Sequence, residues 1–93
     1  MVKLVRLEKP SGPKKYTAVF DDGKRVSFGA KGYSDYTKHH DAERKSRYLQ
    51  RHRSRERWTD LRSPGALSRY LLWNKKSLRA SLADYRKRLS KGR

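Results

Sequence analysis

A dense cluster of cationic side chains stands in the middle of the chain. Guanidinium groups bind phosphate or carboxylate oxygens through paired N–H donors, and neighbouring aromatic rings stack on bases or on the guanidiniums themselves. Only two acidic residues interrupt the positive charge of this segment. The candidate contact residues are Arg44, Lys45, Arg47, Arg51, Arg53, Arg55, Arg57, Arg62 and Trp58. The cluster predicts a surface that holds an acidic partner, and Lys75, Lys76 and Arg79 are candidate extensions of it.

The whole chain shares this excess of positive charge. Its 93 residues include 26 Lys and Arg against 9 Asp and Glu, which gives a formal net charge of +17. Charges that only keep the protein soluble are the alternative interpretation, but so large an excess repels itself and favours an acidic macromolecule that neutralises it. These residue types suit nucleic-acid phosphates and protein carboxylates alike. No motif of a base-reading domain is present, so any binding to DNA is predicted to be independent of sequence.

Other reactive residue types give weaker signals. The three histidines have no cysteine or acidic cluster at metal-ligand spacing, so no metal or other cofactor is expected. Gly29 and Gly32 match neither known phosphate-loop pattern and indicate structural turns. Ser34 and Asp35 lie near histidines, but such combinations are common in polar loops. Neither an enzymatic activity nor a small-molecule substrate is predicted.

Composition also bears on location. The chain contains no cysteine, and it lacks both the apolar stretch of about 7–15 residues of a signal peptide and the run of about 20 that spans a membrane. We therefore expect a protein that is neither secreted nor embedded in a membrane. Only 33% of the residues are hydrophobic, yet two Trp, six Tyr and two Phe can supply a small core.

The first third of the chain predicts a small sheet. Residues 1–13 are expected to form an edge strand over Val2 to Leu7 and a loop, and residues 14–29 a β-hairpin. Asp22 and Gly23 tolerate the positive φ angles of a two-residue turn. Such a turn places Val19 opposite Val26 and Thr17 opposite Phe28.

Residues 41–90 form the predicted helical part. An ordered loop whose aromatic residues serve as anchors precedes a helix that Asp41 caps and that extends to about Arg55. Ser63 and Pro64 begin a short helix at the centre of the core. Ser77 caps a last helix, whose apolar face repeats at helical spacing through Leu78, Leu82, Tyr85 and Leu89.

These elements predict one α+β domain over residues 1–93. A small antiparallel hairpin or three-stranded sheet packs with two or three short helices. The expected core is Phe28, Leu67, Leu71, Trp73, Leu78 and Leu82. For Trp58, which lies beside the arginines, a core role and a contact role are both open.

Two phrases of the sequence carry a resemblance. Residues 26–41 read VSFGAKGYSDYTKHHD and residues 67–74 read LSRYLLWN, with RKSRY at 44–48 between them. Over roughly residues 15–85 the chain resembles a family of small, basic, uncharacterised proteins of nucleocytoplasmic large DNA viruses. The resemblance implies a place in the virion, or in host cytoplasm or nucleus at the viral factory, and it brings no catalytic residues.

Two functions then compete. One is binding or packaging of DNA through its phosphate backbone, and the other is a minor capsid or cement protein that bridges acidic capsid subunits. The positive charge favours DNA, whereas the aromatic anchors and compact fold favour the capsid role. We expect Glu in place of Arg47, Arg51 and Arg55 together to abolish partner binding without unfolding the domain.

Overall fold

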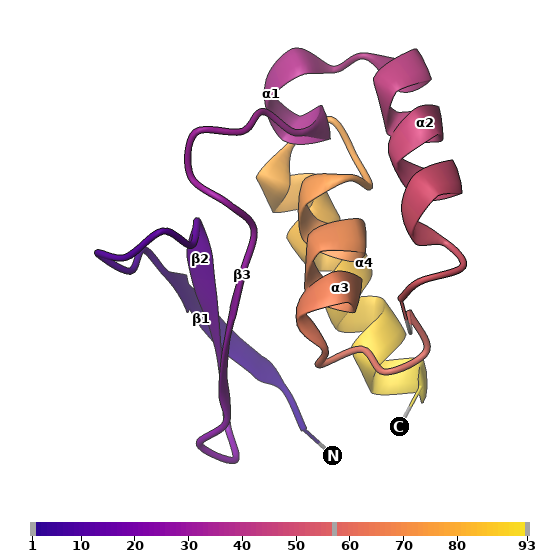
Figure 1. The fold of residues 1–93 in the computed structure, drawn as a ribbon. Helices are drawn as coiled ribbons and strands as arrows, with labels where there is room; N and C mark the ends of the chain where they lie inside the picture. The colour runs from indigo at the N-terminus through magenta and orange to yellow at the C-terminus, as the bar shows by residue number, and fades with distance from the viewer. Residues whose placement is uncertain (1, 57, 93) are drawn as a thin grey trace.

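The computed structural model describes residues 2–56 and 58–92. A three-stranded antiparallel sheet in the order β1-β2-β3 lies on one side of the molecule and the helices on the other (Figure 1). The strands are β1 (Leu4–Glu8), β2 (Tyr16–Phe20) and β3 (Arg25–Phe28). The helices are α1 (Tyr36–His39), α2 (Ala42–His52), α3 (Pro64–Leu67), the π-helical η1 (Ser68–Leu72) and α4 (Leu78–Gly92). The α+β class is confirmed.

The hairpin between β2 and β3 has a longer turn than expected. The backbone N–H of Phe20 donates to the Lys24 carbonyl at 2.9 Å, and that of Gly23 donates to the Phe20 carbonyl at 3.0 Å. Three residues, 21–23, therefore form the loop, and Gly23 takes the positive φ of 91° that its last position requires. Ala18, not Val19, lies opposite Val26. The predicted register was wrong by one residue.

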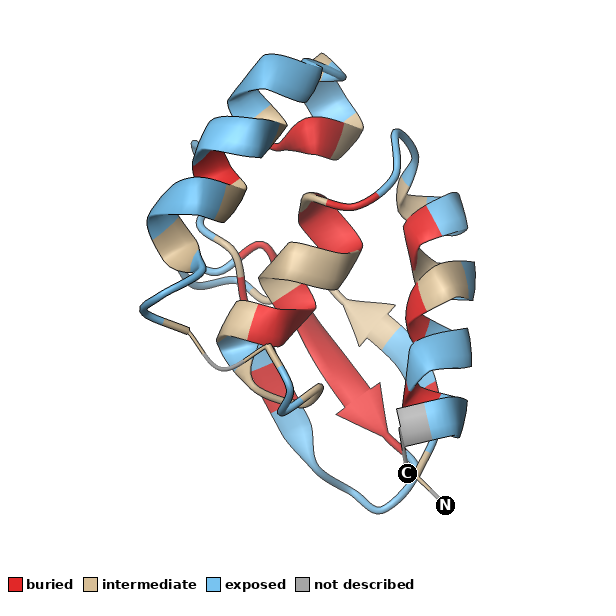
Figure 2. Ribbon diagram, turned by 90° about the vertical axis from the view of Figure 1, so that its right-hand side faces the viewer, coloured by how far each residue is buried: buried red, intermediate tan, exposed pale blue. Residues whose placement is uncertain are grey.

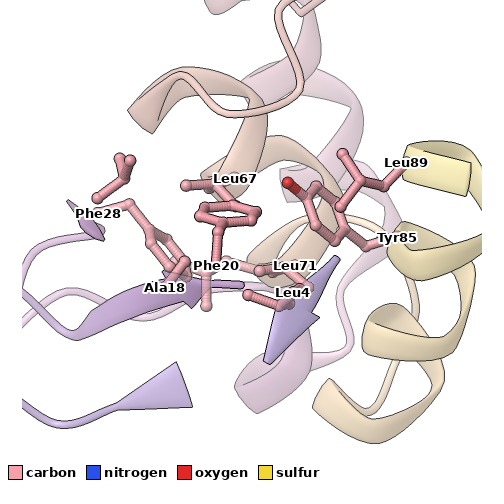
Figure 3. Close-up of a cluster of buried hydrophobic side chains, with 10 residues drawn as sticks. Leu4, Ala18, Phe20, Phe28, Leu67, Leu71, Tyr85 and Leu89 are labelled. Carbon is pink, nitrogen blue, oxygen red and sulfur yellow. The ribbon is translucent and has the colours of Figure 1, made fainter. Parts of the chain in front are cut away.

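The core lies between the sheet and the helical layer, as Figure 3 shows. Ala18, Phe28, Leu67, Leu71 and Tyr85 have no exposed surface. Burial of one Leu or Phe side chain contributes about 1.5–3 kcal/mol to the free energy of unfolding, so a few such residues stabilise a domain this small. Of the expected core, Phe28, Leu67 and Leu71 are confirmed. The others, Trp73, Leu78 and Leu82, are only partly buried and pack against the edge of the cluster.

Side-chain caps begin the longer helices where the sequence places them. The Asp41 carboxylate accepts from the backbone N–H groups of Glu43 and Arg44, and the Ser63 hydroxyl accepts from Ala66 at 3.2 Å. The Ser77 hydroxyl likewise accepts from Ala80 at 3.1 Å. Each bond satisfies a donor that the first helical turn leaves unpaired. The three predicted caps are confirmed.

Helix α2 ends at His52, earlier than the expected end near Arg55. The backbone N–H groups of Arg55 and Glu56 both donate to the His52 carbonyl, at 3.0 and 3.1 Å, so the chain tightens into a turn. The Glu56 carboxylate also lies 2.6 Å from the His52 ring nitrogen. These bonds close one irregular turn directly after the last residue of the helix.

The segment that leads into α2 was expected to be a loop, but it contains α1. The Asp35 carboxylate caps this single turn by accepting from the Thr37 backbone N–H at 3.0 Å. Asp35 is 2% exposed and forms an ion pair with the buried Lys15 ammonium. A buried carboxylate needs such a partner. The pair therefore fastens α1 to the start of the hairpin.

Candidate functional site

Helix α2 rests on the rest of the domain through stacked rings. The Tyr48 ring lies 4.3 Å from the Trp73 ring at an interplanar angle of 4°, and it also stacks on His52 at 4.3 Å. Burial raises the Tyr48 pKa far above its ordinary value, so this hydroxyl stays protonated. Most of the surface of α2 is exposed (Figure 2). The rings thus fix the helix in place while its remaining faces stay in solvent.

Four of the predicted contact residues are exposed cations without an acidic partner. Arg44 and Arg51 project from α2, and Arg53 and Arg55 follow at its C-terminal end. Within residues 2–56 and 58–92, no carboxylate forms an ion pair with any of them. Arg47 is different because its guanidinium lies 3.1 Å from the Glu43 carboxylate one turn earlier.

Lys45 belongs to the same predicted cluster, but the structure turns it inward. Its Nζ donates to the Asn74 carbonyl at 2.6 Å and lies 4.7 Å from the centre of the Tyr36 ring. Burial, together with the charges of Arg69 and Lys75, lowers the Lys45 pKa below its ordinary value. Lys45 joins α2 to the segment before α4 and is not available as an external contact.

Arg62 also has an internal role. Its guanidinium donates to both Asp22 carboxylate oxygens, at 3.0 and 2.8 Å, and lies 5.1 Å from the centre of the Phe20 ring. The backbone N–H of Lys24 and then the Arg62 guanidinium lower the Asp22 pKa. Arg62 thereby ties the hairpin turn to the helical half of the chain.

The remaining two predicted residues lie next to each other in the sequence. Trp58 is half-buried: its indole N–H donates to Glu56 at 3.4 Å, and the Arg69 guanidinium lies 5.5 Å from its ring centre. Burial lowers the Arg69 pKa. The sequence did not indicate that Arg69 contacts Trp58, because the two residues are eleven positions apart. Arg57 lies outside the described residues.

The acidic residues are all engaged within the domain. Each of the nine Asp and Glu side chains accepts at least one hydrogen bond from another group of the chain. Several caps and turns use them, and the others pair with cations. The nine are Glu8, Asp21, Asp22, Asp35, Asp41, Glu43, Glu56, Asp60 and Asp84. None of these carboxylates forms an ion pair with Arg44, Arg51, Arg53 or Arg55 among the described residues.

The positive surface continues from α2 onto the start of α4. Lys75, Lys76 and Arg79 are exposed, and the hydrogen bond from Lys45 to Asn74 brings their segment against α2. We call the exposed set Arg44, Arg51, Arg53, Arg55, Lys75, Lys76 and Arg79 the basic surface.

A cleft of about 520 Å³ borders the basic surface. Arg44 and Arg51 of α2 form part of one wall. Lys14 lines the cleft from the loop between β1 and β2, and Tyr33 lines it from the loop between β3 and α1. Sequence reasoning missed Lys14 and Tyr33 as site residues, although Gly29 and Gly32 mark that loop. Gly29 has a φ of 77°, and a Cβ there would lie 3.0 Å from the Leu72 side chain, so the loop needs glycine.

Among the described residues no three His, Cys, Asp or Glu side chains gather where they could hold a metal ion. Within the same part of the chain, none of the helices combines the length and the apolar character needed to cross a membrane.

Comparison with known proteins gives a single family. A family model described as a family of unknown function (DUF5754) matches residues 3–52. The match extends from the N-terminal strand to the last residue of α2, so it includes the sheet, the glycine-containing loop and two of the seven residues of the basic surface, Arg44 and Arg51. No curated protein and no solved structure matches the chain.

Proposed function

The chain belongs to a family of unknown function (DUF5754), and we propose that it is a non-enzymatic domain that binds the phosphate backbone of DNA without reading its sequence. One observation carries the proposal: four exposed arginines, two on α2 and two at its C-terminal end, form no ion pair with a carboxylate of the described residues, and each of the nine carboxylates accepts its hydrogen bonds from other groups. A polyanion supplies the missing negative charge.

The geometry of α2 suits phosphate contacts. Arg44 and Arg51 lie two helical turns apart on a helix that Asp41 caps and Tyr48 holds in place. Rigid presentation limits the conformational entropy that the arginines lose on binding, and each guanidinium offers paired donors to phosphate oxygens. Each phosphate that is neutralised releases condensed counter-ions, which makes the affinity depend steeply on salt.

The setting of this binding is part of the proposal. The resemblance to proteins of large DNA viruses supports packaging of DNA in the virion or binding at the viral factory. Phosphate contacts of this kind carry no sequence information, which suits a protein that covers long stretches of a genome.

An acidic capsid subunit is the second candidate partner, and one observation favours it. Strand β1 is an edge of the sheet, and its Val5 side chain is 46% exposed. The Arg86 guanidinium covers the Leu4 and Val5 carbonyls of this strand. The rest of the edge, with an apolar side chain beside it, can pair with a strand of another protein. In that arrangement the domain would bridge capsid subunits as a minor capsid or cement protein, and the basic surface would contact their carboxylates.

The test measures binding to duplex DNAs of unrelated sequence across a salt series. We expect equal affinities for all duplexes and a steep fall of log K with log salt. The variant Arg44→Gln, Arg51→Gln, Arg55→Gln should lower the slope by up to about 2.7, at about 0.9 for each phosphate that the variant no longer neutralises. Arg47 is left unchanged because it already forms an ion pair with Glu43.

The matched control removes the same charge elsewhere. Lys9, Lys24 and Lys87 are exposed and lie outside the basic surface, so their joint replacement by Gln should change the slope far less. Equal losses in the two variants would refute the assignment of the surface. Weak binding of the unaltered protein at about 0.15 M salt would refute DNA as the partner and favour an acidic capsid protein.

A further inference from the structure

The cleft beside the basic surface has features that duplex binding does not use. Its volume of about 520 Å³ falls within the range of about 300–1,000 Å³ that is typical of sites for small ligands. Trp73, which is only partly buried, supplies an apolar ring to its lining. A DNA duplex is far too wide to enter such a space, whereas one nucleotide of an unpaired strand can.

Positive charge lines the cleft. Arg44 and Arg51 lie on the α2 wall, and Lys14 lines the cleft from the loop between β1 and β2. Two carboxylates also line it, but both are engaged: Asp35 pairs with Lys15, and Glu56 binds the His52 ring. The cations that are left attract an anionic ligand, and their positions on two walls suit successive phosphates of one strand.

Tyr33 is the second independent feature. The residue is 74% exposed although it lines the cleft, and no aromatic or cationic group among the described residues packs on its ring. It was expected to anchor its loop, but Tyr36, which is 8% exposed, takes that role. An exposed ring next to cations is the usual platform on which a nucleic-acid base stacks.

The loop that carries Tyr33 is held in a defined conformation. Lys31 bonds to the opposite loop twice: its backbone N–H donates to the Pro13 carbonyl at 2.8 Å, and its ammonium donates to the Pro10 carbonyl at 2.6 Å. The Gly32 φ of 89° then turns the chain directly before Tyr33. Because the backbone that carries the ring is already ordered, binding of a base to the ring does not have to order this loop.

We propose that the cleft binds an unpaired nucleotide, with the base stacked on Tyr33 and the flanking phosphates held by Arg44, Arg51 and Lys14. The inference rests on the proposed function and deepens it, because it names single-stranded DNA as the preferred ligand. Bases in a duplex are already stacked on their neighbours, so only an unpaired base can use the Tyr33 ring.

The experiment compares three probes of equal length: a thymidine oligonucleotide, an abasic oligonucleotide and a duplex. The abasic strand retains the phosphates but offers no base. We expect the unaltered protein to bind the thymidine strand more tightly than the abasic one. Tyr33→Ala should weaken binding of the thymidine strand by about 5- to 150-fold and abolish the difference between the two strands. Its affinity for the duplex should stay unchanged.

Tyr33→Phe is the matched control, because it retains the ring and should bind all three probes as the unaltered protein does. If Tyr33→Ala binds the thymidine strand normally while the Arg44, Arg51 and Arg55 variant loses affinity, the cleft inference is wrong and the proposed function stands. If the unaltered protein binds none of the three probes, the proposed function itself fails.

Discussion

Helices α2 and α4 are both rich in cations, but they use them differently. On α4, Arg86 donates to the Leu4 carbonyl at 3.2 Å, and Arg88 binds Asp84 at 2.7 Å and lies over the Tyr70 ring. On α2, Arg44 and Arg51 have no such partner among the described residues. A high content of cations therefore does not identify a binding helix. What matters is whether each cationic side chain bonds to a group within the domain or faces solvent.

The two helices also differ in what they bury. Helix α4 places Tyr85 and Leu89 in the core beside Leu4 of the sheet (Figure 3). Helix α2 has one buried residue, Tyr48, which stacks on Trp73 at the edge of the core. Helix α4 thus stabilises the fold, and α2 displays charged side chains from a fold that other elements hold together.

The largest expected effect is the loss of stability when Tyr85, the buried core residue of α4, is replaced. Tyr85 has no exposed surface, and its hydroxyl donates to the Leu61 carbonyl at 2.7 Å. Tyr85→Ala should lower the free energy of unfolding by about 3–5 kcal/mol, measured by urea denaturation. Tyr85→Phe retains the ring and should cost about 1 kcal/mol. Tyr48→Ala should cost less than Tyr85→Ala, and an equal loss would show that α2 belongs to the core as much as α4 does.

Effects of intermediate size are expected from single substitutions of one arginine on each helix. Arg86→Gln should cost about 1 kcal/mol of stability, because it removes a charged donor from the Leu4 carbonyl, and should leave DNA affinity nearly unchanged. Arg51→Gln should leave stability within about 0.5 kcal/mol and lower the salt slope by about 0.9. Denaturation and DNA titration of both variants check this. Loss of both properties in either variant would remove the distinction between the helices.

The smallest expected effect concerns acid stability. The Arg88 guanidinium first, and the Asn74 amide after it, lower the Asp84 pKa below its ordinary value of 3.8. The stabilisation from the ionised carboxylate is complete above that value and is lost as pH falls through the lower, folded-state pKa. Because the pair is partly exposed, it contributes less than about 1 kcal/mol.

Asp84→Asn should therefore lose less stability than the unaltered protein when pH falls from about 5 to about 2. Thermal unfolding at several pH values measures the difference. Parallel curves for the two proteins would show that the contacts on α4 contribute nothing to its acid response.

Local signals in the sequence predicted much of the fold. The caps at Asp41, Ser63 and Ser77 depend on neighbouring residues only, so they could be predicted directly. The hairpin was also predicted, but its register was not. The same residues permit a two-residue or a three-residue turn, and the structure includes Asp21 in the turn, which shifts the register by one residue. Helix α1 was missed because its cap depends on a buried pair between Lys15 and Asp35, twenty positions apart.

The candidate site was harder to predict for the same reason. Arg44 and Lys45 are adjacent and similar, yet one is exposed and the other bonds to Asn74. Arg62 finds its carboxylate forty positions away at Asp22. The sequence could predict that cations gather in this segment, but only tertiary contacts separate the cations that brace the fold from those that face solvent.

The internal use of every carboxylate also governs how copies of this protein meet. One copy offers few unoccupied carboxylates to the cations of another, and the net charge of +17 makes free copies repel each other. A shared polyanion removes that repulsion, and copies can then lie side by side along it. The length and charge of the polymer would then limit how many copies bind to it. Further copies would stop binding once the polymer is neutralised.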